Sequence, residues 1–175
     1  MGIKEENSEE QMTDMNANSV SEHLNLMDEK DNGNINIAGY LAEEFSLPNM
    51  DIRTVSPLTL AYIGDGIYDL IVRTIIVRQG NAPVNKLHRK VSELVKAQTQ
   101  MKIITSIEDM LSECEISVYK RGRNAKSYTS AKNASKSDYR EATGFEALIG
   151  YLYLEGNMNR AVELIKKGFD LLKES

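Results

Sequence analysis

Apolar and polar residues recur at helical spacing over most of the chain after about residue 52, and the first strong pattern is marked at both ends. It opens at Ser56 and Pro57, an N-cap residue followed by proline at the first helical position. It runs to about Gln79, and Gly80 then supplies a C-cap residue. We therefore predict a helix over about 57–79.

This first helix is predicted to have two different faces. On a helical wheel, Asp65, Asp69 and Arg73 gather on one side. The opposite side carries Leu60, Ile63, Ile67, Leu70, Ile71 and Thr74. We expect the second side to face the core and the charged side to carry chemistry.

A second helical pattern starts near Asn85 and extends to about Ile104, and a break is possible before Ile107. Its apolar positions are Leu87, Val91, Leu94, Val95, Met101 and Ile104. Its early turns expose a basic group that consists of Lys86, His88, Arg89 and Lys90.

The segment after Ser112 is predicted to be a short helix that carries the only cysteine of the chain. Ser112 and Glu115 have the spacing of a capping box, which opens a helix toward Arg121. The single cysteine, Cys114, cannot form an internal disulfide and has no metal-ligand spacing, so we expect partly buried packing and a reducing cytosol.

Two further helices are expected near the C-terminus. Asp138 and Glu141 have the spacing of a capping box for a helix through about Leu154. Gly156 and Asn157 then turn the chain into a last amphipathic helix, whose apolar residues are Val162, Ile165, Phe169 and Leu172.

Length and composition agree with one all-α domain and an appendage. The chain has 175 residues, 41% of them hydrophobic, with three prolines and no tryptophan. Few turn residues interrupt the helical patterns, so a β-sandwich or barrel is not favoured. No apolar run reaches membrane-spanning length, and the acidic, Asn-rich N-terminus does not resemble a secretory signal. We expect a cytoplasmic protein without a membrane segment.

The net charge of −5 hides two segments of opposite charge. Residues 1–52 hold two Lys or Arg and twelve Asp or Glu, a net charge of −10. Residues 53–175 hold 19 and 14, a net charge of +5. We predict an acidic N-terminal extension over 1–52, largely disordered to about Asn36 and with a short helix possible over 37–47. The predicted working domain, 53–175, is basic.

The most basic segment, 119–140, is predicted to be a loop that contacts nucleic acid. It holds seven basic residues and one acid, Asp138, for a net charge of +6. Ser, Thr, Asn and Gly lie between the charges, and such a mixture suits phosphate oxygens. The candidate RNA-binding residues are Lys120, Arg121, Arg123, Asn124, Lys126 and Lys132, and Tyr119 and Tyr128 are candidates for packing on sugars or bases. A merely solvated loop is the alternative.

Asp65 and Glu146 are the candidate chemical residues. Asp65 lies between Gly64 and Gly66 in an apolar helix, and each glycine costs roughly 1 kcal/mol relative to alanine. This pattern suggests that another helix or a ligand approaches the backbone there. Glu146 likewise has small residues on its face of the later helix.

Two carboxylates on separate helices repel each other unless they are protonated, separated or bridged by a cation, and oxygen ligands suit Mg²⁺ or Mn²⁺. Spacing alone leaves two interpretations open for Asp65 and Glu146. Either they bind metal, or each caps a helix or pairs with a base such as Arg73 or Lys102.

Three ordered segments, PLTLAYIGDGIYDLIVR, KRGRNAKS and YREATGFEALIGYLYLEGN, resemble the Mini-III branch of the ribonuclease III family. The resemblance covers about 56–169. It implies an all-α endonuclease domain that acts as a homodimer, with double-stranded RNA across the dimer valley and an Mg²⁺-dependent site in each subunit. By motif, Asp65 matches the catalytic and metal-binding aspartate of the family's GD signature, and Glu146 matches the glutamate of its FEALIG segment.

This chain departs from full-length ribonuclease III enzymes at two acidic positions, which here hold Ala61 and Thr143. The reduced set resembles the Mini-III branch and implies fewer protein ligands on the metal. Asp69, one turn from Asp65, is left as a candidate for orienting metal-bound water or as an exposed polar residue.

The resemblance implies maturation of precursor large-subunit (23S) ribosomal RNA, with 5′-phosphate and 3′-hydroxyl products. Few residues follow the last predicted helix, so we expect the catalytic domain itself, through KRGRNAKS, to bind RNA. Two other functions stay open: a non-catalytic RNA-binding protein on the same scaffold, and a helical protein-interaction module. His23 and His88 have no partners expected of a histidine metal site.

Overall fold

A computed structural model describes residues 36–126 and 135–174, in which every regular element is a helix. The α-helices are α2 (Ile37–Glu44), α3 (Pro57–Arg78), α4 (Val84–Val95), α5 (Ala97–Ile107), α6 (Glu113–Asn124), α7 (Lys136–Leu154) and α8 (Met158–Glu174). Two 3₁₀ turns, η1 (Ile52–Thr54) and η2 (Glu108–Met110), precede α3 and α6. The all-α prediction is confirmed for these residues, and none of their helices is long and apolar enough to cross a membrane.

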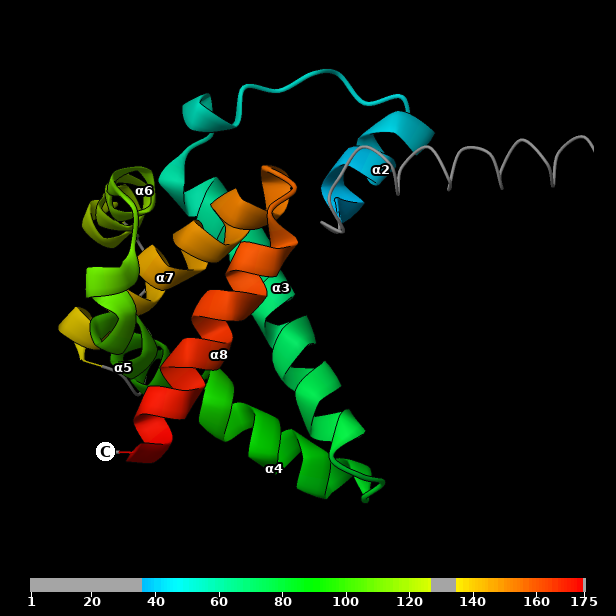
Figure 1. Ribbon diagram of the computed structural model, residues 1–175, viewed down its shortest axis with the longest axis vertical. Helices are drawn as coiled ribbons and strands as arrows, with labels where there is room; N and C mark the ends of the chain where they lie inside the picture. The colour runs from blue at the N-terminus through cyan, green and yellow to red at the C-terminus, as the bar shows by residue number, and fades with distance from the viewer. Residues whose placement is uncertain (1–35, 127–134, 175) are drawn as a thin grey trace, which may run out of the picture. The chain divides into compact units, whose positions relative to one another are not determined.

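Helix α7 is the centre of the core, and α3, α5, α6 and α8 surround it (Figure 1). From Ala142 to Tyr153, every residue except Glu146 and Tyr151 is buried. On α3, Tyr68 packs its ring edge-on against Phe145, with 5.1 Å between ring centroids and 87° between planes. The apolar run of α7 therefore forms an internal helix and not an amphipathic surface helix.

The crossing of α3 and α7 is close because a glycine lies on each helix. A Cβ atom at Gly64 would lie 1.8 Å from the backbone oxygen of Glu146, and one at Gly150 would lie 2.0 Å from the backbone oxygen of Leu60. No side chain fits at either position. The sequence prediction of a close backbone approach is confirmed for Gly64. At Gly66, a Cβ would meet no atom within 4 Å, so that glycine faces open space.

The predicted core face of α3 is wrong by part of a turn. The buried residues are Leu60, Ala61, Gly64, Tyr68, Val72 and Ile76. Leu70 and Thr74, predicted to face the core, are exposed, whereas Ile63, Ile67 and Ile71 are half-buried. The helix is apolar on more than one side, so the wheel did not distinguish the buried stripe from an exposed one.

The second predicted helix is two helices, and the break lies at Lys96 instead of before Ile107. Lys96 has extended backbone dihedrals, φ −65° and ψ 147°. The Thr99 hydroxyl donates to the Glu93 carbonyl (2.7 Å), and the Gln100 amide donates to the Val95 carbonyl (3.0 Å). Side chains at the start of α5 thus take the carbonyls that the end of α4 leaves unpaired.

Helix caps explain the boundaries of α6 and α7. Ser112 and Glu115 form the predicted capping box at the start of α6. The cap predicted at Asp138 is wrong, because Ser135 is the N-cap of α7 and accepts from the Asp138 N–H (3.0 Å). Glu141 makes no capping box and instead accepts from the Tyr119 hydroxyl.

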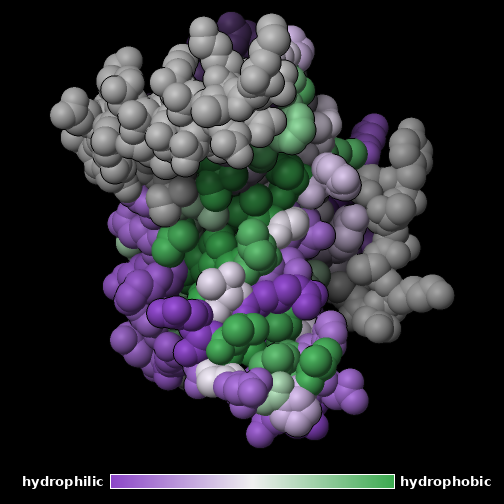
Figure 2. Space-filling model, turned by 90° about the vertical axis from the view of Figure 1, so that its right-hand side faces the viewer, coloured by the Kyte–Doolittle hydropathy of each residue, from purple (hydrophilic) through white to green (hydrophobic). Residues whose placement is uncertain are grey.

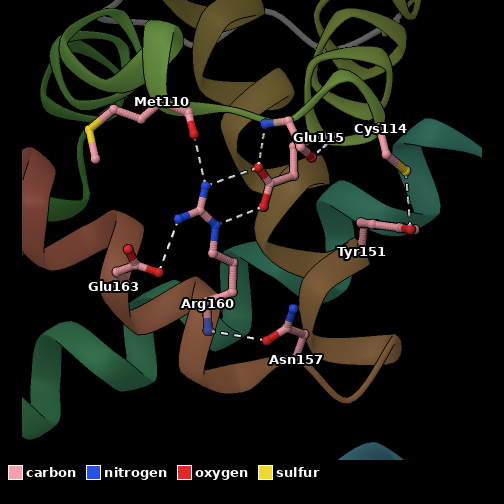
Figure 3. A network of polar contacts seen from close by, with 8 residues as sticks. Met110, Cys114, Glu115, Tyr151, Asn157, Arg160 and Glu163 are labelled. Atoms are coloured by element: carbon pink, nitrogen blue, oxygen red, sulfur yellow. Dashed lines mark hydrogen bonds and ion pairs between the residues drawn. The ribbon is translucent and has the colours of Figure 1, made fainter.

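Arg160 links α8 to the start of α6 (Figure 3). Its Nε and Nη2 donate to the two carboxylate oxygens of Glu115 (2.9 and 3.1 Å), and Nη2 also donates to the Met110 carbonyl (2.9 Å). Burial raises the pKa of Glu115, but hydrogen bonds from Arg160 and Ser112 outweigh it, so that pKa lies below its ordinary value. The pair is therefore well satisfied although Glu115 is buried.

Two smaller predictions have opposite outcomes. The short helix possible over 37–47 is present as α2. Cys114, expected to be partly buried, is exposed, and its Sγ lies 3.3 Å from the Tyr151 hydroxyl. The disorder predicted up to Asn36 concerns residues that lie outside the described part of the chain, with the exception of Asn36, which caps α2.

Candidate functional site

Asp65 and Glu146 line the same pocket, in which α3 and α7 form the walls. The pocket has a volume of about 700 Å³. Its lining residues are Leu58, Ala61, Tyr62, Ile63, Asp65, Gly66, Tyr139, Thr143 and Glu146. The two acids predicted from sequence are thus brought together, and Ala61 and Thr143, the positions of the two missing acids, lie in the same pocket.

Asp65 lies in the middle of α3, on the open side of the helix. Partial burial raises the pKa of its carboxyl, and the negative charge of Asp69 raises it further. Asp69 itself pairs with Arg73 one turn later. Arg73, the candidate base for pairing, is therefore held by Asp69 and not by Asp65.

Glu146 is half-buried within the most buried stretch of the protein. Its neighbours Phe145 and Ala147 are fully buried, and the Gly64 contact fixes α3 against its backbone. Burial and, to a smaller extent, the charge of Asp65 raise the pKa of Glu146, the neighbouring Gln100 side chain lowers it, and the net result is a pKa of about 7. The carboxyl therefore lies in a place that penalises its charge unless a cation is nearby.

The donor set fits a hard divalent cation. Neither Asp65 nor Glu146 has an ion pair within residues 36–126 and 135–174, so the pairing alternative finds no support there. Both have a raised pKa, and an adjacent dication would relieve the repulsion that contributes to it. These same ranges contain no group of three or more His, Cys, Asp or Glu side chains that could hold a metal ion. Such a cation would take only two carboxylates from the described chain and would need other oxygen ligands.

Gln100 is a site residue that the sequence reasoning missed. It lies on α5, is 1% exposed, and its side chain is near enough to Glu146 to lower the pKa of that carboxyl. A glutamine in a polar stretch, KAQTQ, gives no signal of burial. Its position becomes informative only when the break at Lys96 is known, because the break rotates the start of α5 relative to α4.

Within the basic segment predicted as a loop, most of the residues that the structure describes are helical. Residues 119–124 belong to α6 and residues 136–140 belong to α7. Lys120, Asn124 and Lys126 are not buried, as an RNA-binding surface requires. Lys132 and Tyr128 lie outside the described residues.

Arg121 and Arg123 have structural partners in addition to any role with RNA. Arg121 donates to the carbonyls of Arg53 (3.4 Å) and Val55 (3.0 Å), which ties α6 to the segment before α3. Arg123 lies 3.7 Å from the Glu141 carboxylate. Arg121 and Arg123 therefore stabilise the fold in addition to any contact that they make with RNA.

Tyr119 is not available for stacking on RNA. It is 2% exposed, and its hydroxyl donates to Glu141. Burial raises the pKa of Tyr119, and the hydrogen bond to Glu141 raises it further. The expectation of a stacking tyrosine here is wrong, because the aromatic ring belongs to the core beneath the basic surface.

Residues 58–157 match the model of the family described as "Ribonuclease III domain". The chain is 50% identical over 137 residues to Mini-ribonuclease 3 of Clostridium tetani (strain Massachusetts / E88), covering 78% of this chain and 89% of that protein. It is 43% identical over 136 residues to Mini-ribonuclease 3 of Thermoanaerobacter sp. (strain X514), covering 78% and 96%.

Among solved structures, the fold is similar to a crystal structure of a protein from Fusobacterium nucleatum, with a TM-score of 0.63 and 30% sequence identity. The alignment covers 73% of this chain and all of that one. The similarity therefore extends over the helical domain that holds the pocket.

Proposed function

Because the chain belongs to the Mini-ribonuclease 3 family and carries a ribonuclease III domain, we propose that it is an endoribonuclease of double-stranded RNA. The products have 5′-phosphate and 3′-hydroxyl ends, and the substrate is precursor large-subunit ribosomal RNA in the cytoplasm. The observation that carries the proposal is the pocket in which Asp65 and Glu146 meet.

Asp65 and Glu146 would hold Mg²⁺, or Mn²⁺ in its place. Such a cation would supply positive charge to stabilise the scissile phosphate and would lower the pKa of an attacking water. The two carboxylates bring negative charge to a partly enclosed place, and the apolar wall made by Leu58 and Ile63 limits the water around them. The positions of Ala61 and Thr143 leave room for RNA and water oxygens in the pocket.

The test of activity uses long double-stranded RNA with Mg²⁺ and compares wild type with Asp65→Asn. We expect the wild type to cut, and Asp65→Asn to bind RNA but lose at least about a hundredfold in cleavage rate. Asp109→Asn removes an exposed carboxylate on η2 and is the matched control. A wild type that binds RNA but never cuts with any divalent metal would identify the alternative, a non-catalytic RNA-binding protein. A chain without RNA affinity at moderate salt would identify an interaction module.

RNA contact is proposed for the accessible end of α6, with Lys120, Asn124 and Lys126 as the first candidates. The double variant Lys120→Ala and Lys126→Ala should weaken binding and lower the salt dependence by about one ion for each phosphate that is no longer neutralised. The control pair, Lys167→Ala and Lys173→Ala on α8, changes the net charge equally. Equal weakening by both pairs would mean that net charge alone matters.

Arg121 and Arg123 belong to the proposed RNA-binding surface only in part. Because Arg121 holds two backbone carbonyls, Arg121→Ala is expected to lower thermal stability as well as RNA affinity. RNA binding by this variant therefore has to be compared at a temperature where both proteins are folded.

A homodimer is proposed because α3 has an exposed apolar stripe. Four large apolar residues of α3 are exposed: Leu58 (38%), Tyr62 (82%), Leu70 (57%) and Val77 (58%). Figure 2 shows the side of the molecule on which α3 lies, with hydrophobic residues gathered in its middle and again lower down, separated by hydrophilic ones. Several large apolar residues exposed on one helix are typical of an interface. The stripe borders the pocket through Leu58 and Tyr62, so a second copy would lie next to the two carboxylates.

Sedimentation equilibrium tests the dimer. Leu70→Lys should shift the protein to monomer and reduce cleavage, because the RNA-binding valley would be lost. Val84→Lys places the same charge at a residue that is 63% exposed on α4 and is the control. A wild type that is monomeric at all concentrations would remove the dimer from the proposal and leave the pocket unaffected.

A further inference from the structure

Gln100 occupies a position in which an aliphatic side chain is expected. It is 1% exposed, and Ile103, Ile104 and Ile107 on the same helix are fully buried. Burying a primary amide costs free energy unless its donors and acceptor are all paired. A glutamine at this place therefore needs a reason other than packing.

The buried side-chain amide of Gln100 has a hydrogen-bond partner for its nitrogen but none for its oxygen. One amide N–H donates to the Val95 carbonyl (3.0 Å), and the side chain lies close enough to the Glu146 carboxyl to lower the pKa of that group. The Oε1 atom has no hydrogen-bond partner, and it is the one buried side-chain polar atom in this condition within residues 36–126 and 135–174. Stability alone would favour an apolar residue that leaves no acceptor unpaired.

The chemistry of the amide suits a carboxylate that must stay charged. A lysine or arginine beside Glu146 would cancel its charge and compete with a cation for its oxygens. A neutral amide can orient the carboxylate without either effect, as outer hydrogen bonds do for metal-ligating carboxylates. The rigid core around Gln100 and the close packing at Gly64 hold the donor and the acceptor on fixed helices.

We propose that Gln100 is a positioning residue that holds the Glu146 carboxylate in the orientation required for a divalent cation, and that it acts through Glu146 instead of contacting RNA. This inference rests on the function proposed above. It assigns to α5 a part in a site whose two carboxylates come from α3 and α7.

The first experiment measures cleavage of double-stranded RNA over a range of Mg²⁺ concentrations with Gln100→Leu. The Mg²⁺ concentration for half-maximal cleavage should rise at least about tenfold. The KM for RNA should stay within about twofold, because the residue does not touch RNA. A wild-type Mg²⁺ dependence in Gln100→Leu would overturn the proposal.

Two neighbouring variants are the controls. Gln98→Leu makes the same substitution at a more accessible position two residues earlier. Thr99→Val removes the other side-chain hydrogen bond to the end of α4, from the Thr99 hydroxyl to the Glu93 carbonyl, without removing a partner of Glu146. Thr99→Val should lower stability and leave the Mg²⁺ dependence unchanged. If it shifts the Mg²⁺ dependence as far as Gln100→Leu does, the α4–α5 junction is responsible and the proposal is wrong.

A second measurement uses the wild type and does not depend on the folding of a variant. Addition of Mg²⁺ should shift the side-chain amide signals of Gln100 in a ¹⁵N-correlated NMR spectrum, and the signals of Gln98 should move much less. Gln100 signals that stay in place at saturating Mg²⁺ would overturn the proposal. A wild type that cuts no RNA with any divalent metal would instead refute the proposed function, which separates the two failures.

Discussion

Replacement of Glu146 with glutamine should make the metal-free protein more stable at neutral and alkaline pH. Burial, with a contribution from the charge of Asp65, raises the pKa of this carboxyl from 4.5 to about 7, so folding favours the protonated form. At 1.36 kcal/mol for each pH unit, the difference corresponds to about 3 kcal/mol of unfolding free energy. Glutamine is neutral at every pH and has nearly the same shape, so it avoids this cost.

The pH dependence of the gain follows from the direction of the pKa change. Because the folded-state pKa is raised, protonation of Glu146 stabilises the fold fully below pH 4.5, and this contribution is lost as the pH rises to about 7. Glu146→Gln and wild type should therefore differ little in pH dependence below about pH 4.5. Their unfolding free energies should separate between the two values and differ by up to about 3 kcal/mol above pH 7.

The assay is urea unfolding of both proteins with EDTA, at several pH values from 4 to 8. Glu155→Gln, an exposed position at the end of the same helix, separates burial from net charge. A gap between Glu146→Gln and wild type that is constant with pH, or an equal gap for Glu155→Gln, would refute the reasoning. Mg²⁺ in place of EDTA should narrow the gap at pH 8, because a cation bound by Glu146 stabilises only the wild type.

Two matched pairs test the packing. Gly64→Ala should destabilise the protein by roughly 3 kcal/mol, because the new Cβ would lie 1.8 Å from the Glu146 backbone oxygen. Gly66→Ala, where a new Cβ would meet no atom within 4 Å, should instead stabilise the helix by up to about 1 kcal/mol. Thermal unfolding of both variants measures these two changes. Arg160→Leu should cost about 3 kcal/mol, because it leaves a buried carboxylate unpaired. Glu163→Gln, at a side chain that is 60% exposed, should change stability by less than about 1 kcal/mol, and equal losses for the two would contradict the assigned burial.

Helix identity was predictable from the sequence because caps and spacing are local. Ser56 and Pro57 start α3, and the box of Ser112 and Glu115 starts α6, as predicted. The cap of α7 was misjudged because several nearby polar residues have the required spacing, and only tertiary contact commits Glu141 to Tyr119. Local rules therefore find the helices more reliably than they choose among adjacent caps.

The buried face of α3 was not predictable for a different reason. Leu70 and Tyr68 are both apolar enough for a core, and the chain alone does not tell which stripe meets α7. A helix with one apolar stripe in the core and a second apolar stripe on the surface has the same sequence pattern as a helix that is buried on all sides. The error is informative at one position, because Leu70, which was wrongly assigned to the core, belongs to the exposed stripe that is proposed to meet a second copy.

The candidate site was only partly accessible from sequence. The glycines around Asp65 indicated a close approach, and the motifs identified Glu146 as its counterpart. Gln100 escaped because its role depends on a contact between helices more than forty residues apart in sequence. Arg121 was placed in the RNA-binding set because charge is visible in sequence, whereas its two carbonyl partners are not.

The glycine crossing of α3 and α7 has a consequence for engineering. Where two backbones touch, main-chain atoms set the spacing of the helices as long as Gly64 and Gly150 are kept, so the separation of Asp65 and Glu146 should withstand extensive redesign of the surrounding core. Attempts to change metal preference are therefore better directed at side chains that enter the pocket, such as Ala61 and Thr143, than at the packing of the helices. The same rigidity would make this pair of helices a suitable scaffold on which to install additional carboxylates one at a time.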